Sequence, residues 1–144
     1  MVDSKRDGQL NETLELFHFA FRAFTAKPDK ILEGRGLARV HHRILYFVAR
    51  NPNLTVSALL SILAVSKQAL NAPLRQLVEM GLVESRAASD DRRQRLLRLT
   101  LEGEKLERAL SGAQRKKMAA AFERLGRDAE RGWRRVMAEL ARDG

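Results

Sequence analysis

Residues 54–100 constrain the fold most, because their apolar side chains change period along the stretch in the order helix, turn, helix and hairpin. Thr55 can cap a first helix and Ser66 a second, and Gly81 stands where a left-handed residue would end the second helix. Residues 64–65 form the turn between them. The buried stripe of the first helix is expected to consist of Val56, Leu59, Leu60 and Leu63.

The second helix, which should run to residue 80, has an apolar face and a polar face. At about 100° per residue, Leu70, Leu74 and Leu77 point one way, and polar or small side chains point the other way. The opposite face consists of Gln68, Asn71, Ala72 and Arg75. Gln and Asn can bond adenine, Arg can bond guanine, and a small Ala allows close approach to the bases. Ser66 and Lys67 lie in the first turn, where backbone amides and the positive helix end suit a phosphate.

The alternative is an ordinary solvated face on a two-helix hairpin, and this helix alone does not separate the two. Pro73 also lies inside the helix, where it removes an amide donor and disfavours helical geometry at Ala72. We therefore expect either a kink or a helix that starts only near Asn71. Both outcomes leave Arg75 on the polar face and put Gln68 in question.

Two short β-prone runs follow at residues 82–86 and 95–99, and the turn-rich residues 87–94 join them. The arginines in or beside this hairpin are Arg86, Arg92, Arg93, Arg95 and Arg98. Such a hairpin can straddle phosphates or insert an arginine into a minor groove. A solubilising turn is the alternative. Asp90 and Asp91 oppose a purely electrostatic grip, unless one of them holds an arginine in a fixed pose.

Together these features resemble a winged helix and, more narrowly, the MarR family of bacterial transcription regulators. The matching motifs are Gly81-Leu82-Val83 with Arg86, Asp91-Arg92-Arg93, and Leu99-Thr100 followed by Glu102-Gly103. The resemblance extends to the flanking helices and implies a mainly α fold with a small β-hairpin wing. It also implies DNA contacts from the recognition helix, at Ser66, Lys67, Gln68, Asn71, Ala72 and Arg75. The implied wing contacts are Arg86, Arg92, Arg93 and Arg95.

The net charge of +9 is concentrated on this proposed reader. Residues 35–100 carry 11 basic and 4 acidic side chains, whereas residues 1–34 carry 5 basic and 6 acidic ones. The imbalance favours a polyanionic partner, above all double-stranded DNA, bound in a salt-dependent manner. A membrane surface is another polyanion, but the sequence shows no long apolar span, signal peptide or strongly basic amphipathic terminus. We therefore expect a cytoplasmic protein with no membrane partner.

Few residues invite another chemistry. The chain has no cysteine, which excludes disulfides, cysteine-based zinc fingers and the thiol peroxide sensor found within the resembled family. His18, His41 and His42 are better explained by packing or exposure than by a metal, since adjacent histidines project about 100° apart on a helix. No Gly-x-Ser-x-Gly elbow, Gly-rich phosphate loop or HExxH motif is present. We expect no metal, no cofactor and no enzymatic activity.

The flanking segments are helical, and the length suits one domain over residues 1–144. After a polar, frayed start at residues 1–9, a first helix is expected at 10–26, with a break at 27–36 that contains Pro28. A second helix at 37–50 begins the winged-helix part, residues 37–100, and its inward side chains are Leu37, Val40, Ile44, Phe47 and Val48. Its opposite side, with Arg35, Arg39, Arg43 and Arg50, fits a solvated face better than a second DNA track. Thr100 can cap a helical region at 101–142, interrupted near 111–112 or at 126.

Both flanking regions carry long apolar stripes that a small winged helix cannot cover, so a homodimer through residues 10–26 and 101–142 is the economical arrangement. Its predicted interface consists of Leu10, Leu14, Phe17, Phe21, Phe122, Leu125, Trp133, Val136 and Leu140. A monomer with an internal helical cap is the alternative. A twofold dimer would place two recognition helices in successive major grooves, about 34 Å apart, on an inverted repeat. We expect a repressor, because no segment resembles a polymerase-contacting activator.

Members of the resembled family often sense small aromatic or anionic ligands in a cleft between the dimerisation helices and the winged helix. The candidate lining residues for such an effector are Phe17, Phe21, His42, Arg43 and Tyr46. Aromatics at helical spacing are more often core, so the sequence leaves the effector open. A second functional class also stays open: an interaction module whose basic face binds an acidic protein surface or RNA without operator specificity.

Overall fold

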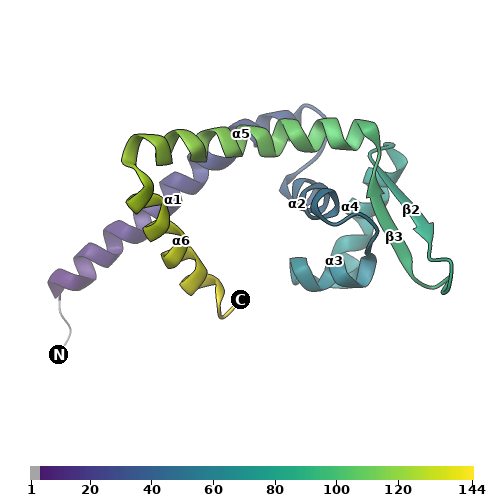
Figure 1. Cartoon of the computed structure of the whole chain (residues 1–144), viewed down its shortest axis with the longest axis horizontal. Helices are drawn as coiled ribbons and strands as arrows, with labels where there is room; N and C mark the ends of the chain where they lie inside the picture. Colours follow the sequence, from purple (N-terminus) through teal and green to yellow (C-terminus); the bar gives the residue numbers. More distant parts are fainter. Residues whose placement is uncertain (1–3) are drawn as a thin grey trace.

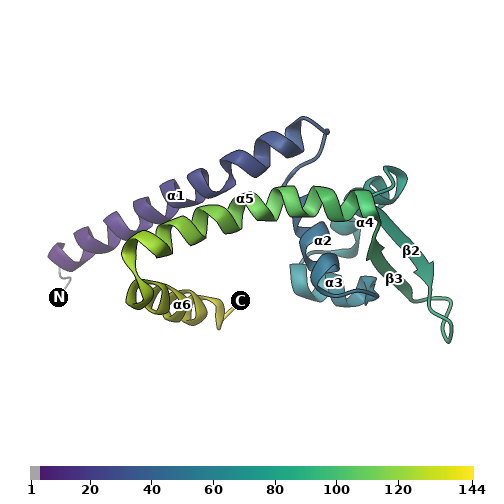
Figure 2. The ribbon, with the colours of Figure 1, turned by 45° about the horizontal axis from the view of Figure 1, so that its top comes forward.

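In the computed structural model, which describes residues 4–144, a helical arm adjoins a winged-helix lobe, and one long helix of the arm starts at the lobe (Figure 1). The arm consists of α1 (Ser4–Glu33), α5 (Leu101–Leu125) and α6 (Arg127–Ala141). The lobe consists of α2 (Arg39–Arg50), β1 (Leu54–Thr55), α3 (Val56–Leu63), α4 (Lys67–Glu79), β2 (Val83–Ala87) and β3 (Arg95–Leu99). α1 runs beside α5, and α6 folds back at the far end of α5 (Figure 2). The predicted fold class is confirmed.

Local signals fix the ends of the lobe helices. The hydroxyl of Thr55 accepts a hydrogen bond from the amide of Ala58, and that of Ser66 from the amide of Ala69, each at 3.1 Å. These are the two predicted caps, and each satisfies an amide that the helix leaves unpaired. Gly81, which follows the C-cap residue Met80 of α4, has a φ of +74°, as predicted.

The sheet is antiparallel, in the order β1-β3-β2. Val83 pairs with Leu99 and Ala87 with Arg95, so β2 and β3 form the predicted hairpin. The short edge strand β1 was not predicted, because two residues are too few to show an alternating pattern. It pairs Leu54 with Leu97 and ties the start of α3 to the wing.

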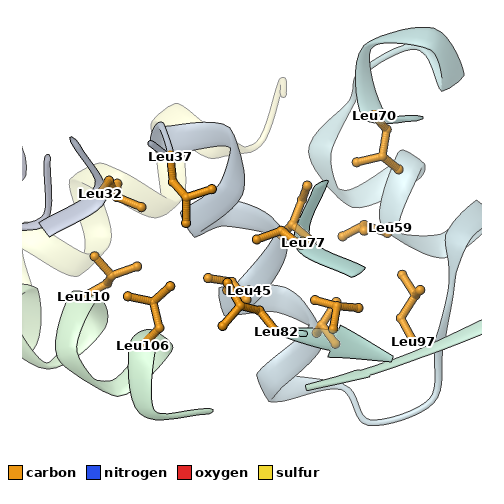
Figure 3. Close-up of a cluster of buried hydrophobic side chains, with 13 residues drawn as sticks. Leu32, Leu37, Leu45, Leu59, Leu70, Leu77, Leu82, Leu97, Leu106 and Leu110 are labelled. Carbon is orange, nitrogen blue, oxygen red and sulfur yellow. The ribbon is translucent and has the colours of Figure 1, made fainter. Parts of the chain in front are cut away.

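A leucine-rich core joins the lobe to α1 and α5 (Figure 3). Its members are Leu32, Leu37, Ile44, Leu45, Val48, Leu59, Leu70, Leu77, Leu82, Val83, Leu97, Leu106 and Leu110. Burial of each such side chain stabilises the fold by about 1.5 to 3 kcal/mol. Because Leu106 and Leu110 come from α5 and Leu32 comes from α1, the core fixes the arm to the lobe.

The first helix extends further than the sequence predicted in both directions. Residues 4–9 are helical and not frayed, whereas residues 1–3 lie outside the described part of the chain. At the other end α1 passes through Pro28 and ends at Glu33, so the predicted break at 27–36 is wrong for residues 27–33. Pro28 and Leu32 are both buried, and this packing offsets the hydrogen bond that a proline removes from a helix.

Of three further boundaries, one differs from the prediction and two decide between alternatives that the sequence left open. α4 starts at Lys67, so Pro73 does not delay its start to Asn71; the Ser66 cap and the buried Leu70 hold the first turns. α2 starts at Arg39, two residues later than predicted. The arm is interrupted at Gly126, which has a φ of +98° and is one of the two predicted positions; residues 111–112, the other one, are helical.

Candidate nucleic-acid interface and ligand cavity

The recognition-helix candidates form one exposed face of α4. Ser66, Lys67, Gln68, Asn71, Ala72 and Arg75 are all exposed. Leu70 and Leu77, on the other side, are fully buried, and their burial turns the polar face outward. Within residues 4–144, the side chains of Lys67, Asn71 and Arg75 have no ion pair or hydrogen bond to another element. These side chains are therefore available to a partner molecule.

The four wing candidates are exposed but not equivalent. Arg95 lies along the hairpin, with its Nη2 donating to the carbonyl of Ser85 at 2.7 Å and its Nε to the Ser85 hydroxyl at 3.0 Å. Arg86 approaches Glu84 at 3.8 Å. Arg92 and Arg93 occupy the tip, and their guanidinium groups have no partner among the described residues. The tip arginines are thus the freest to contact phosphate.

One of the two wing aspartates has a structural role. The carboxylate of Asp91 accepts a hydrogen bond from the backbone amide of Arg93 at 2.9 Å. This is a local turn contact, which shapes the tip without neutralising an arginine side chain. Asp91 therefore organises the hairpin and leaves its positive charge in place.

A cavity of about 760 Å³ lies between the arm and the lobe. Of the predicted effector residues, Phe21, His42, Arg43 and Tyr46 line it, while Phe17 does not. Phe17 lies one turn before Phe21 on α1 and is exposed, so it belongs with the apolar stripe and not with the cavity. Other lining residues were not predicted, because they come from four helices that only the fold brings together; the main ones are Phe24, Arg39, Arg50, Ser111, Arg115, Met118, Phe122 and Arg134.

Two cavity arginines are neutralised by buried or half-buried carboxylates. Arg39 bonds Asp29 at 2.8 Å, and this hydrogen bond lowers the pKa of the Asp29 carboxyl below its usual value. Arg50 bonds Glu107 at 2.9 Å and stacks over Tyr46, with 4.6 Å between the guanidinium carbon and the ring centre. The Glu107 side chain is only 4% exposed. These two ion pairs connect α2 to α1 and to α5.

The remaining cations give the cavity an unbalanced positive charge. Arg134 lies 3.3 Å from Glu130 on its own helix, but Arg43 and Arg115 have no carboxylate within ion-pair distance among residues 4–144. Both line a cavity that also presents aromatic rings. The arrangement suits a ligand with a carboxylate and an apolar ring.

The histidines are packed in the structure. His42 is buried and its Nε2 lies 3.0 Å from the hydroxyl of Ser111 on α5. Burial lowers the pKa of His42 below its usual value, so its neutral form is favoured. Within the described residues, no three histidine or acidic side chains come together as a metal site. No helix in residues 4–144 is both long enough and apolar enough to span a bilayer.

The candidate dimer residues remain on the surface of a single chain. Leu14 is 68% exposed, Leu125 74% and Leu140 63%, and Leu10, Phe17, Phe21, Trp133 and Val136 are exposed as well. Phe122 is half-buried, with its ring 5.5 Å from that of Trp133 in an edge-to-face contact between α5 and α6. One chain therefore leaves an extended apolar stripe uncovered along its arm, more than a surface usually carries.

Comparison with known proteins agrees with this architecture. Residues 35–94 match the sequence model of the MarR family. The chain is 49% identical over 134 residues to the HTH-type transcriptional regulator PetP of Rhodobacter capsulatus, covering 93% of this chain and 81% of PetP. Among solved structures, it resembles NadR in complex with 4-hydroxyphenylacetate, with 28% identity, a TM-score of 0.72 and coverage of 88% and 89%. It also resembles the MarR family transcription regulator SP03579, with 22% identity, a TM-score of 0.80 and coverage of 96% and 92%.

Proposed function

Because the chain belongs to the MarR family of winged helix-turn-helix transcription regulators, we propose that it is a homodimeric repressor of an inverted-repeat operator, released by a small aromatic acid. The observation that carries the proposal is the exposed face of α4, where the side chains of Asn71 and Arg75 have no partner among residues 4–144. Asn71 would read adenine and Arg75 guanine, while Lys67 and the wing arginines would hold phosphates.

Dimer formation is supported by the apolar stripe along α1, α5 and α6. Covering side chains as large as Leu14, Phe17 and Leu140 with a second copy removes their apolar area from water, at about 25 cal/mol per Å². The twofold axis would then repeat α4 at a spacing that must match one turn of B-DNA, about 34 Å. The operator is therefore an inverted repeat in this proposal, and a bound dimer would occlude an overlapping promoter.

The effector proposal is supported by the cavity and its two unneutralised arginines. A carboxylate would lie between Arg43 and Arg115, and an aromatic ring would pack against Phe21, Tyr46 and Met118. NadR, whose solved structure contains 4-hydroxyphenylacetate, supplies a probe with this chemistry. The cavity is lined by both the arm and α2. A ligand there would bind more tightly to one spacing of the two winged-helix lobes of the dimer than to another. If the favoured spacing does not fit the operator, ligand binding releases the DNA.

The operator is tested by incubating the protein with random genomic fragments and sequencing what is retained as salt is raised. Enrichment of one inverted repeat supports the proposal, and its loss in an Arg75→Ala variant assigns base reading to α4. Retention without enrichment would instead indicate an interaction module with no operator specificity.

The assembly and the effector need separate measurements. Light scattering after size exclusion should give about twice the 16.3 kDa of one chain at micromolar concentration, and a 16.3 kDa species would exclude the dimer. Titration with 4-hydroxyphenylacetate should weaken operator binding in the natural protein and leave an Arg43→Gln/Arg115→Gln variant unchanged. A natural protein that binds no aromatic acid would be a repressor without this class of effector.

A further inference from the structure

Gln76 connects the recognition helix to the rest of the lobe. Its Oε1 lies 2.9 Å from Nε2 of His41 on α2, and its Nε2 donates to the carbonyl of Gly36 at 3.4 Å. Within residues 4–144, no other side chain of α4 makes a hydrogen bond or ion pair to another helix or strand. Apart from this amide, α4 is held to the lobe by apolar contacts.

The partner of Gln76 is fixed in its turn. His41 is buried, and its Nδ1 accepts a hydrogen bond from the amide of Ala38 at 2.9 Å, which caps the start of α2. An Nδ1 that accepts must be unprotonated, so the neutral ring carries its proton on Nε2 and donates it to Gln76. The direction of both hydrogen bonds made by Gln76 is thereby determined.

We propose that Gln76 is a positioning residue for DNA reading: its amide, held by His41 and Gly36, sets the rotation of α4 about its axis. Burial of Leu70 and Leu77 decides which face of α4 points outward, whereas the distance and angle that a hydrogen bond requires fix the rotation of the helix more narrowly. Gln76 follows Arg75 directly, so a rotation of α4 that breaks its bonds moves the guanidinium relative to a base edge. This inference rests on the proposed reading role of Arg75.

The first test needs no DNA. Hydrogen exchange of residues 67–79 is measured by mass spectrometry in the full-length natural protein and in Gln76→Met, which keeps the length of the side chain and removes both bonds. Loss of these two bonds should speed exchange of α4 about fivefold, while exchange of α5, which Gln76 does not bond, should stay unchanged. Gln68→Met is the matched control, because Gln68 lies on the same helix and its side chain has no hydrogen-bond partner in the described part of the chain. It should leave the exchange of α4 unchanged. Unaltered exchange in Gln76→Met, or faster exchange in every helix, would overturn the proposal.

The second test compares affinity for the selected operator with affinity for random DNA. Gln76→Met should lower this ratio at least fivefold and leave random-DNA affinity and its salt dependence as they were. Gln76→Glu keeps the acceptor for His41 but loses the donor to the Gly36 carbonyl, so it should recover only part of the ratio, whereas a merely space-filling role would leave Gln76→Met at the natural ratio. An equal loss on operator and random DNA would refute the positioning role. If the natural protein enriches no operator, the proposed function fails, and the exchange measurement still decides whether Gln76 fixes α4.

Discussion

The junction between α5 and the wing makes a sharp prediction at Gly103. A Cβ added there would lie 2.0 Å from the carbonyl oxygen of Leu82 and 3.0 Å from its carbonyl carbon. The same oxygen accepts a hydrogen bond from the amide of Thr100 at 3.1 Å, so it is held in place. Both atoms belong to backbone, and neither can rotate away. An alanine at position 103 must push the start of α5 off the base of β2 by more than about 1 Å to reach ordinary contact distance.

The magnitude follows from two opposing effects. Replacement of glycine by alanine inside a helix gains about 0.5 to 1 kcal/mol of unfolding free energy. Overpacking a rigid site costs about 1 to 3 kcal/mol, and more where backbone must move. Leu82 and Val83 are buried beside the clash, so displacement also disturbs the core. We therefore expect Gly103→Ala to lose at least about 2 kcal/mol relative to the natural protein.

Gly112→Ala is the matched control, because Gly112 lies on the same helix and a Cβ there meets only the Arg115 side chain at 3.9 Å. It should gain about 0.5 to 1 kcal/mol from helix propensity alone. Both variants are unfolded by denaturant and followed by circular dichroism at one protomer concentration, since dimer dissociation would otherwise shift the midpoint. Equal stability of the two variants would show that α5 and Leu82 do not approach as closely as the structure has them.

Three other perturbations test the cavity and the DNA-reading face. Arg50→Met leaves the buried Glu107 carboxylate unpaired and should cost about 3 kcal/mol of unfolding free energy. The double variant Arg50→Met/Glu107→Leu should recover most of this loss. An Arg50→Met variant with unchanged unfolding free energy would contradict the pairing. Burial lowers the pKa of His42 from 6.5, with Arg43 adding to the effect and Glu107 and Asp29 opposing it. The stabilisation due to neutral His42 is therefore complete above about pH 6.5 and is lost as pH falls toward its folded pKa, because the unfolded chain takes up the proton first. His42→Gln should flatten this part of the pH profile, and an unchanged profile would assign the acid sensitivity elsewhere. Arg75→Ala should cost about 1 to 3 kcal/mol of binding free energy at one operator base pair, whereas Arg92→Ala should weaken binding to all sequences evenly and reduce the salt slope by about 1. Quantitative binding to operators with single-base changes separates the two effects. An even loss for Arg75→Ala would make Arg75 a phosphate contact.

The elements that the sequence predicted well are determined by residues close together in the chain. Thr55 and Ser66 each cap a helix through an amide three positions on, and Gly81 ends α4 through its own backbone conformation. The hairpin likewise depends on two adjacent runs and one turn. Such signals lie wholly inside a short window of sequence, so no knowledge of tertiary packing is needed to interpret them.

The boundaries that were wrong depend on packing between distant segments. Pro28 ends most helices, but in this chain it lies buried with Leu32 against the core, and the gain from burial exceeds the loss of a hydrogen bond. Pro73 is tolerated in α4 for a similar reason, since Leu70 and Leu77 are buried on either side of it. A local propensity cannot show which prolines have such compensation.

The two adjacent histidines illustrate the limit for functional residues. Sequence spacing shows that His41 and His42 project about 100° apart on α2, which argues against a shared metal but does not show what either side chain contacts. Their partners, Gln76 and Ser111, lie 35 and 69 residues away in the chain. Because one histidine bonds the recognition helix and the other bonds α5 beside the ligand cavity, α2 is in direct polar contact with both proposed sites. We therefore expect that a ligand which shifts α2 changes the angle of α4 through the hydrogen bond between His41 and Gln76.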